Sequence, residues 1–162
     1  MRDLLQKRKD SGFTIVEVML VLAIGGLIIL IVFLAVPALQ RNSRNTQRVN
    51  DVSALGASIN EYSSSHNGVM GSFTQGLLVQ NAKLGFYDSA HTSVIYSRVA
   101  AARTTPLAVT PNTDAVTITN YLKCNPEGTA SITTGASARN WVALYTIENG
   151  SATGMQLQCK EL

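Results

Sequence analysis

The longest uninterrupted apolar stretch in the chain runs from Val18 to Leu39 and contains no charged residue. Leu, Ile, Val and Ala dominate it, while Gly25, Gly26 and Pro37 interrupt the run of large apolar side chains. A helix of this length would measure about 33 Å, which exceeds the roughly 30 Å hydrocarbon core of a bilayer. The pattern therefore predicts a helix that can span a membrane.

Past this stretch the apolar positions take on the spacing of one helix face. They recur every three or four residues, at Val49, Val52, Leu55, Ile59 and Tyr62. This period predicts an amphipathic helix whose apolar stripe packs on another surface. The charged residues of the same stretch are expected on its other faces: Arg41, Arg44, Arg48 and Asp51.

The amphipathic helix should end in a Ser-rich polar run, where Asn67 or Gly68 can adopt the left-handed backbone of a C-terminal cap. The two helical patterns are contiguous along the chain. They therefore predict a single helix from near Phe13 to near Ser64, bent slightly at Pro37.

The C-terminal third alternates between apolar and polar residues with the period of β-strands. Strands are predicted at 116–124, 140–148 and 155–160. Asn149-Gly150 is a turn signal that favours an antiparallel hairpin between the last two strands. Asn149-Gly150-Ser151 also matches a glycosylation acceptor, but the turn explains these residues more simply.

Residues 69–111 carry the weakest pattern, mixing Gly, Ser and Thr with short apolar runs. A long loop over the helix is expected there, with residues 93–99 as a candidate strand. Together the elements predict an α+β fold, in which one long N-terminal helix packs against a small antiparallel sheet.

Composition adds few candidate functions. The net charge of +3 is small and lies mostly in the first 12 residues, so we expect no nucleic-acid partner. The row of Arg41, Arg44 and Arg48 could contact DNA or lipid headgroups, but a solvated helix face or ion pairs between subunits explains it more simply.

The chain also lacks patterns that carry catalysis. His66 and His91 are isolated, without a spaced carboxylate or cysteine that would complete a metal site. Neither a nucleophile elbow nor a phosphate-binding glycine loop occurs. We therefore expect no enzyme activity, no cofactor and no metal.

Cys124 and Cys159 are the two cysteines of the chain. In a chain with a membrane segment, an isolated pair indicates one disulfide formed in an oxidising compartment, with two free thiols as the alternative. Both cysteines occupy the apolar phase of their predicted strands and should point toward the same core, which supports the bridge.

The residues ahead of the apolar stretch depart from the order of a secretory signal peptide. The basic residues Lys7-Arg8-Lys9 are separated from the stretch by Asp10-Ser11-Gly12, and no Ala-x-Ala cleavage site follows it. One interpretation is a plain signal anchor that holds an unprocessed binding domain at a membrane.

Glu17 lies inside the apolar segment, where a carboxylate costs about 2.5–3.5 kcal/mol at the bilayer centre and less near its edge. It could sit at the interface and reach headgroup water. Alternatively, it has a charged partner. Cleavage between Gly12 and Phe13 would create an amine one helical turn from Glu17, and Glu17 of one subunit could pair with Phe13 of the next.

The segment Lys9-Asp10-Ser11-Gly12-Phe13-Thr14-Ile15-Val16-Glu17 resembles the class III signal peptide of type IV pilins and pseudopilins. From Lys9 to about Tyr62 the resemblance rests on the sequence motif. In the remainder of the chain it rests only on the order of the predicted elements. It implies that a prepilin peptidase cleaves after Gly12 and methylates the amine of Phe13. It further implies that Glu17 docks the subunit into a growing filament.

Three further features follow from the resemblance. Pilins usually carry a helix-bending proline about one turn earlier than Pro37 stands in this chain. Gly25 and Gly26 fall where pilin helices commonly loosen in the filament, although close helix packing in the membrane is an alternative role for them. The pair Cys124 and Cys159 is similar to the disulfide that bounds the C-terminal loop of many pilins.

The resemblance implies a cleaved leader at 1–12, a transmembrane and filament-core helix at 13–40, its amphipathic half at 41–64 and a globular head at 65–162. The expected function is that of a structural subunit, held in the cytoplasmic membrane and then assembled into an extracellular pilus for adhesion or motility. Its partners would be copies of itself, the prepilin peptidase and the assembly machinery. A pseudopilin of a type II secretion or DNA-uptake system is the alternative, since it shares this N-terminus.

Overall fold

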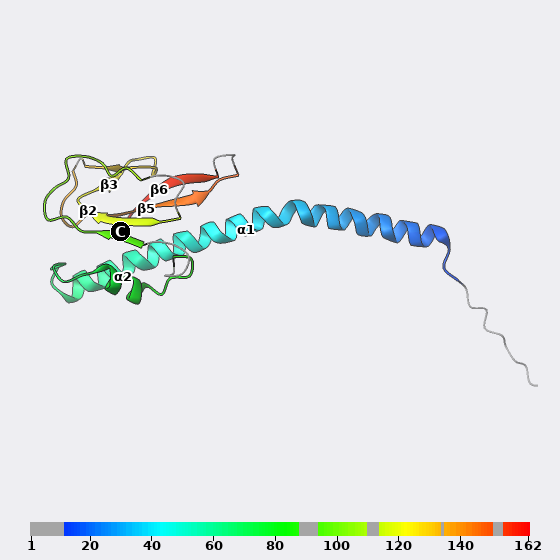
Figure 1. Ribbon diagram of the computed structural model, residues 1–162, viewed down its shortest axis with the longest axis horizontal. Helices are drawn as coiled ribbons and strands as arrows, with labels where there is room; N and C mark the ends of the chain where they lie inside the picture. The colour runs from blue at the N-terminus through cyan, green and yellow to red at the C-terminus, as the bar shows by residue number, and fades with distance from the viewer. Residues whose placement is uncertain (1–11, 88–93, 110–113, 134, 151–153) are drawn as a thin grey trace, which may run out of the picture. The chain divides into compact units, whose positions relative to one another are not determined.

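The computed structural model describes residues 12–87, 94–109, 114–133, 135–150 and 154–162 (Figure 1). The chain divides into two compact units, one ending at Leu39 and the other beginning at Gln40. A single helix, α1 (Ile15–Ser65), begins in the first unit and ends in the second. The prediction of one helix from near Phe13 to near Ser64 is therefore confirmed. The expected leader, apart from its last residue, lies outside the described residues, as do His91 and Ser151.

The end of α1 has the predicted left-handed cap. Asn67 has a φ of 52° and Gly68 a φ of 81°. The N–H of Gly68 donates to the carbonyl of Ser63 at 2.7 Å, the long hydrogen bond of a Schellman-type ending. Pro37 lies inside α1, and the bend expected there stays a prediction.

The face of α1 that is buried in the second unit differs in part from the predicted stripe. Three predicted positions are fully buried: Val52, Leu55 and Ile59. Val49, however, is 38% exposed, while Arg48 and Asp51 are buried, so these three predictions were wrong. Arg48 lies one turn before Val52 and shares its face, and the polar groups that allow its burial come from distant parts of the chain.

The second unit holds a four-stranded sheet of order β1-β2-β5-β6. Its strands are β1 (Val94–Ser97), β2 (Val116–Asn120), β5 (Trp141–Glu148) and β6 (Met155–Glu161). β1 runs parallel to β2, and the other neighbours are antiparallel. The sheet is thus mixed rather than antiparallel as predicted, because the long connection between β1 and β2 leaves room for a crossover.

The predicted hairpin between the last two strands is confirmed, with Leu144 opposite Cys159. Its connection is longer than a two-residue turn. The N–H of Asn149 donates to the carbonyl of Gly154 at 3.1 Å. Among the described residues of this connection, Gly154 rather than Asn149 or Gly150 has a left-handed backbone. The expected alternation of buried and solvent-exposed residues is absent from β6. Its side chains are half-buried or exposed, because β6 is an edge strand of the sheet.

The single strand predicted at 116–124 is broken in two. Tyr121 takes a left-handed backbone with a φ of 60°, which turns the chain after β2. Residues beyond it form β3 (Lys123–Cys124), which pairs with β4 (Ser131–Ile132) in a separate two-stranded sheet. A left-handed tyrosine is rare, so alternation alone could not predict this break.

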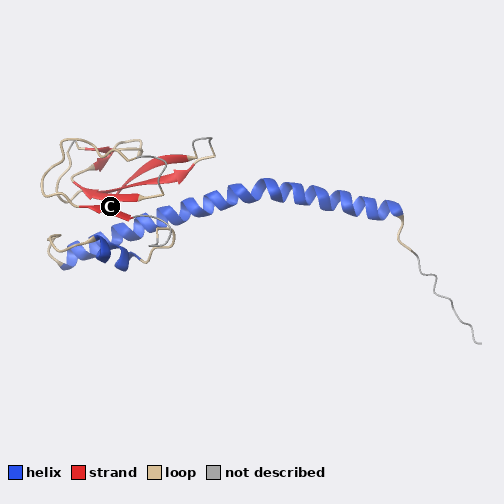
Figure 2. Ribbon diagram, viewed as in Figure 1, coloured by secondary structure: helices blue, strands red, loops and turns tan. Residues whose placement is uncertain are grey.

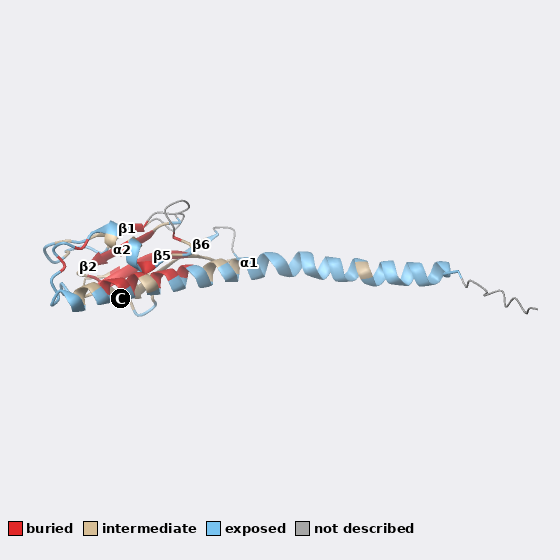
Figure 3. Ribbon diagram, turned by 90° about the horizontal axis from the view of Figure 1, so that it is seen from below, coloured by how far each residue is buried: buried red, intermediate tan, exposed pale blue. Residues whose placement is uncertain are grey.

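The region predicted as a long loop contains a helix, α2 (Gln75–Ala82), which lies against β1 (Figure 2). Thr74 caps its start by accepting the N–H of Leu77, and Lys83 ends it with a φ of 46°. The core of the second unit lies between the buried face of α1, α2 and the sheet, with β2 and most of β5 buried (Figure 3).

Candidate functional site

The start of α1 is closed by reciprocal hydrogen bonds between Thr14 and Glu17. The backbone N–H and the hydroxyl of Thr14 each donate to Oε2 of Glu17 at 2.9 Å. The N–H of Glu17 in turn approaches the Thr14 Oγ1 at 3.3 Å. This arrangement is a capping box, which satisfies donors that the first turn of a helix leaves without partners.

The capping box is a role for Glu17 that sequence reasoning missed, although Thr14-x-x-Glu17 carries its signature. Both bonds to the carboxylate use Oε2, so Oε1 accepts no hydrogen bond among the described residues. All atoms of the box belong to Thr14 and Glu17. Cleavage of the Gly12–Phe13 bond would therefore leave it intact, with one carboxylate oxygen still open to a second partner.

The Gly12–Phe13 bond precedes the first helical residue of α1, Ile15. Phe13 is 88% exposed, and a Cβ placed on Gly12 would meet no atom within 4 Å. Nothing in the described chain thus requires a glycine at this position. The junction lies outside regular structure.

The first unit presents apolar side chains around the whole circumference of its helix. Large apolar residues from Phe13 to Val36 are exposed, and none of the most apolar window of α1 is buried. By length and composition this helix can cross a membrane. An apolar surface this extensive needs lipid or partner helices to cover it.

Gly25 and Gly26 lie within α1, and a Cβ on either would meet no atom within 4 Å. Packing within the chain therefore does not account for two adjacent glycines, which together weaken a helix by about 2 kcal/mol relative to alanine. Their predicted role in helix flexibility, like that of Pro37, stays a prediction.

Two arginines of the basic row along the second half of α1, Arg44 and Arg48, form ion pairs within the chain. Arg44 forms a bidentate pair with Glu148 at the end of β5, through Nε–Oε1 at 2.7 Å and Nη2–Oε2 at 2.6 Å. The hydrogen bonds from Arg44 hold the pKa of the Glu148 carboxyl below its usual range. The side-chain amide of Asn45 adds two bonds, one to the carbonyl and one from the N–H of Glu148, each at 2.8 Å.

Arg48, only 1% exposed, lies at the centre of these charges. Its Nη2 is 2.7 Å from Oδ1 of Asp114 and 3.4 Å from Oε1 of Glu148. Its guanidinium carbon lies 4.4 Å from the centroid of the Phe86 ring, a cation–π contact. The expectation that Arg48 belongs to a solvated face or pairs between subunits was therefore wrong.

Asp51 holds the segment after α2 against α1. Its carboxylate accepts the N–H of Gly85 at 3.0 Å, that of Phe86 at 2.6 Å and that of Tyr87 at 2.9 Å. Successive backbone N–H groups of this kind form a small anion-binding concavity. With Arg44 and Arg48, Asp51 anchors three segments far apart in sequence to one helix.

The predicted disulfide between Cys124 and Cys159 is present, with the two Cα atoms 5.6 Å apart. It joins β3 of the small sheet to β6 of the larger one. The N–H of Cys159 also donates to the carbonyl of Gly128 at 2.7 Å. The bridge therefore fixes the β3–β4 hairpin to the edge of the main sheet.

No group of three His, Cys, Asp or Glu side chains that could hold a metal occurs in the part of the chain that the structure describes. Of the two histidines, only His66 is described. Its ring stacks on Tyr62 with 3.9 Å between the centroids, beside the cap of α1.

Comparison with known families finds a motif at the N-terminal end of the chain. Residues 7–33 match the prokaryotic N-terminal methylation motif. The match includes the Gly12–Phe13 junction, Glu17 and the glycine pair of the apolar helix. No curated protein and no solved structure matches the chain.

Proposed function

We propose that this chain, whose residues 7–33 match the prokaryotic N-terminal methylation motif, is a structural subunit of a type IV pilus, cut by a prepilin peptidase after Gly12. The processed protein is held in the cytoplasmic membrane by α1. It then polymerises through that helix into an extracellular filament, which serves adhesion or motility. The membrane and filament are successive surroundings for the same apolar surface.

The exposed apolar surface of α1 is the observation that carries this proposal. Other copies of the same helix can cover it at every position once the subunit leaves the lipid. A fixed membrane anchor would need the lipid alone. The second feature of the segment is the Glu17 carboxylate, whose Oε2 caps α1 while Oε1 accepts no hydrogen bond among the described residues and can take a partner from another subunit.

Cleavage would supply a positively charged partner for this carboxylate. The new amine of Phe13 is positive, and N-methylation keeps that charge. In the proposed filament, Oε1 of Glu17 in one subunit accepts a hydrogen bond from the amine of Phe13 in its neighbour, while Oε2 continues to cap α1. In an apolar interior, loss of one partner of such a pair typically costs about 3–5 kcal/mol, so the pair selects correctly docked subunits.

A pseudopilin of a secretion or DNA-uptake system shares the N-terminal motif and is the second candidate. The Cys124–Cys159 disulfide favours the pilus, because it fixes a separate hairpin to the sheet and suits a subunit exposed outside the cell.

Mass spectrometry and electron microscopy of the producing cells test the proposal. The mature chain should begin at Phe13 with a methylated amine, and surface fibres should disappear when the gene is deleted. A mature chain that keeps residues 1–12 would overturn processing. Fibres that persist after deletion would overturn the role as a principal subunit.

A further inference from the structure

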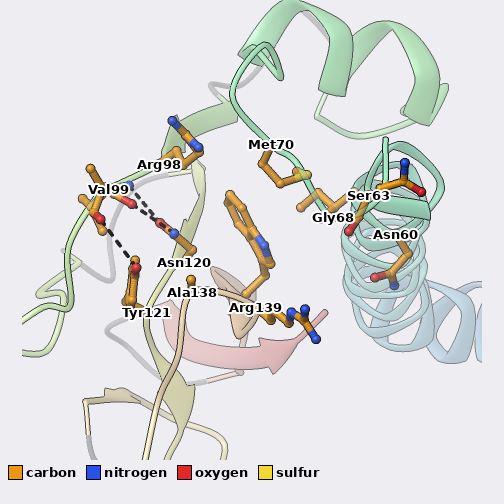
Figure 4. A pocket seen from close by; sticks show the side chains of 14 residues that line it. Asn60, Ser63, Gly68, Met70, Arg98, Val99, Asn120, Tyr121, Ala138 and Arg139 are labelled. Carbon is orange, nitrogen blue, oxygen red and sulfur yellow. Dashed lines mark hydrogen bonds between the residues drawn. The ribbon is translucent and has the colours of Figure 1, made fainter. Parts of the chain in front are cut away.

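The second unit contains a cavity of about 690 Å³ between the C-terminal end of α1, the end of β2 and the segment that leads into β5. Figure 4 shows its walls. The volume falls within the range of small-ligand sites, about 300–1,000 Å³. Filament assembly through the first unit makes no use of this cavity.

The walls of the cavity are held by their own hydrogen bonds. The side chain of Asn120 accepts the N–H of Val99 at 2.8 Å and donates to its carbonyl at 3.1 Å, which fixes the segment after β1 (Figure 4). The next residue, Tyr121, keeps its left-handed backbone on the same wall. A strained, non-glycine backbone at a cavity wall is typical of a preformed site.

Two arginines give the cavity its charge. Arg98 and Arg139 line it from different segments and lie on opposite sides of it in Figure 4. Neither guanidinium has a hydrogen bond or ion pair among the described residues, and none of the described lining residues is acidic. Paired guanidinium groups without counter-ions favour an anion, which each can hold through two parallel hydrogen bonds.

The wall formed by the C-terminal end of α1 and its cap supplies neutral hydrogen-bonding groups. The side chains of Asn60, Ser63 and Asn67 line the cavity and bond to no other described residue. Trp141 also lines the cavity and is only 5% exposed. Its indole N–H has no acceptor among the described residues and is not one of their buried groups without a partner, so it is open to a hydrogen bond from the cavity side.

We propose that this cavity binds an acidic saccharide, a sugar that carries a carboxylate together with several hydroxyl groups. Because Arg98 and Arg139 lie on opposite sides of the cavity, each binds the carboxylate of a different acidic sugar unit. The amide, hydroxyl and indole groups bind the sugar hydroxyls. A nucleotide fits less well because Tyr96 stacks on one face of the Trp141 ring, with 5.6 Å between the ring centroids, which leaves less aromatic surface for a base. This binding site is independent of the proposed filament function.

Tryptophan fluorescence reports on the site directly, since Trp141 is the only tryptophan in the chain. The full-length protein, in non-ionic detergent micelles, is titrated with digalacturonate. We expect a saturable change in fluorescence with a dissociation constant near 1 mM or below. Arg98→Gln and Arg139→Gln should each weaken binding about tenfold, the usual effect of removing a charge-assisted hydrogen bond.

Three matched probes and one matched variant decide the chemistry. The dimethyl ester of digalacturonate, adenosine monophosphate and inorganic phosphate should each bind at least about tenfold more weakly than the acid. Lys83→Gln removes an exposed positive charge outside the cavity and should leave binding unchanged. The proposal is overturned if the ester, the nucleotide or phosphate binds as tightly as the acid. It is also overturned if Lys83→Gln weakens binding as much as the arginine variants do. A third contradicting result is the absence of any saturable change in fluorescence up to about 10 mM digalacturonate.

Discussion

Glu148 receives both donors of the Arg44 guanidinium in parallel, at 2.7 and 2.6 Å, although the two residues lie on different elements of the second unit. Arg44 belongs to α1, and Glu148 is the last residue of β5. Planar bidentate pairs of this kind combine a favourable charge interaction with a defined orientation. The pair therefore fixes the end of the β5–β6 hairpin against the helix.

Removal of this pair should make stability depend less on pH. The pKa of Glu148 is lower in the folded chain than in the unfolded chain, because Arg44 bonds the carboxylate. The stability it contributes is thus present above about pH 4.3 and is lost as pH falls through the folded-state pKa. Glu148→Gln should lower the unfolding free energy by roughly 1–2 kcal/mol at pH 7, and the difference from wild type should shrink in acid.

Chemical denaturation of the full-length protein in detergent, followed by Trp141 fluorescence, measures this difference at each pH. Glu61→Gln is the matched control, since Glu61 is exposed on α1 and its side chain forms no hydrogen bond or ion pair with the residues that the structure describes. A Glu148→Gln deficit that stays constant from pH 7 to about pH 3 would contradict the assigned role of the ionised pair.

Asp51→Asn tests the anchor of the segment after α2. Asparagine keeps the shape of the side chain but replaces a charged acceptor of three backbone N–H groups with a neutral amide. We expect a loss of about 2–3 kcal/mol in unfolding free energy, against less than about 0.5 kcal/mol for Glu61→Gln. Equal stabilities of the two variants would show that Asp51 does not hold this segment.

The buried charges also show where sequence reasoning reached its limit. The helical period predicted α1 and the burial of Val52, Leu55 and Ile59, because that signal is local. Arg48 continues the same face, but its partners Asp114 and Glu148 are distant in sequence, and the default for an unpaired arginine is the surface. Which polar residues are buried depends on tertiary contacts that no local pattern records.

Other differences have local causes that could have been recognised. Thr14-x-x-Glu17 carries the signature of a capping box, and Thr74 precedes α2 as a typical N-cap. The parallel pairing of β1 with β2 and the left-handed Tyr121 are different in kind. Strand direction depends on the path of a long connection, and a positive φ at tyrosine has no side-chain signal.

Gly56 is predicted to be required for packing rather than for flexibility. A Cβ on Gly56 would lie 2.8 Å from Cδ2 of Leu162, so Gly56→Ala must displace that side chain. We expect a net loss of about 1 kcal/mol despite the better helix propensity of alanine. Gly76→Ala in α2, where the nearest atom would be 3.9 Å away, should instead stabilise the protein by about 0.5–1 kcal/mol. Stabilisation by both substitutions in denaturation experiments would refute the packing role.

Loss of the Cys124–Cys159 bridge should loosen the small sheet before the large one. The double variant Cys124→Ala/Cys159→Ala should lose about 2–4 kcal/mol of unfolding free energy. Hydrogen exchange should show the N–H groups of β3 and β4 losing protection first, because the bridge is the covalent link between that hairpin and β6. A reductant should destabilise wild type to a similar extent and leave the double variant unchanged. Uniform loss of protection across both sheets would argue against this local role.

Filament formation by Glu17→Gln tests the proposed pairing of subunits most directly. Glutamine can still accept the Thr14 N–H and cap α1, but it removes the charge that the Phe13 amine of a neighbour requires. Thr14→Ala is the complementary control, since it removes the hydroxyl of the cap and keeps the carboxylate. Mass spectrometry of each variant reports cleavage, and electron microscopy counts fibres. We predict that both variants are cleaved after Gly12, that Thr14→Ala forms fibres and that Glu17→Gln forms none. Normal fibres from Glu17→Gln would contradict the account.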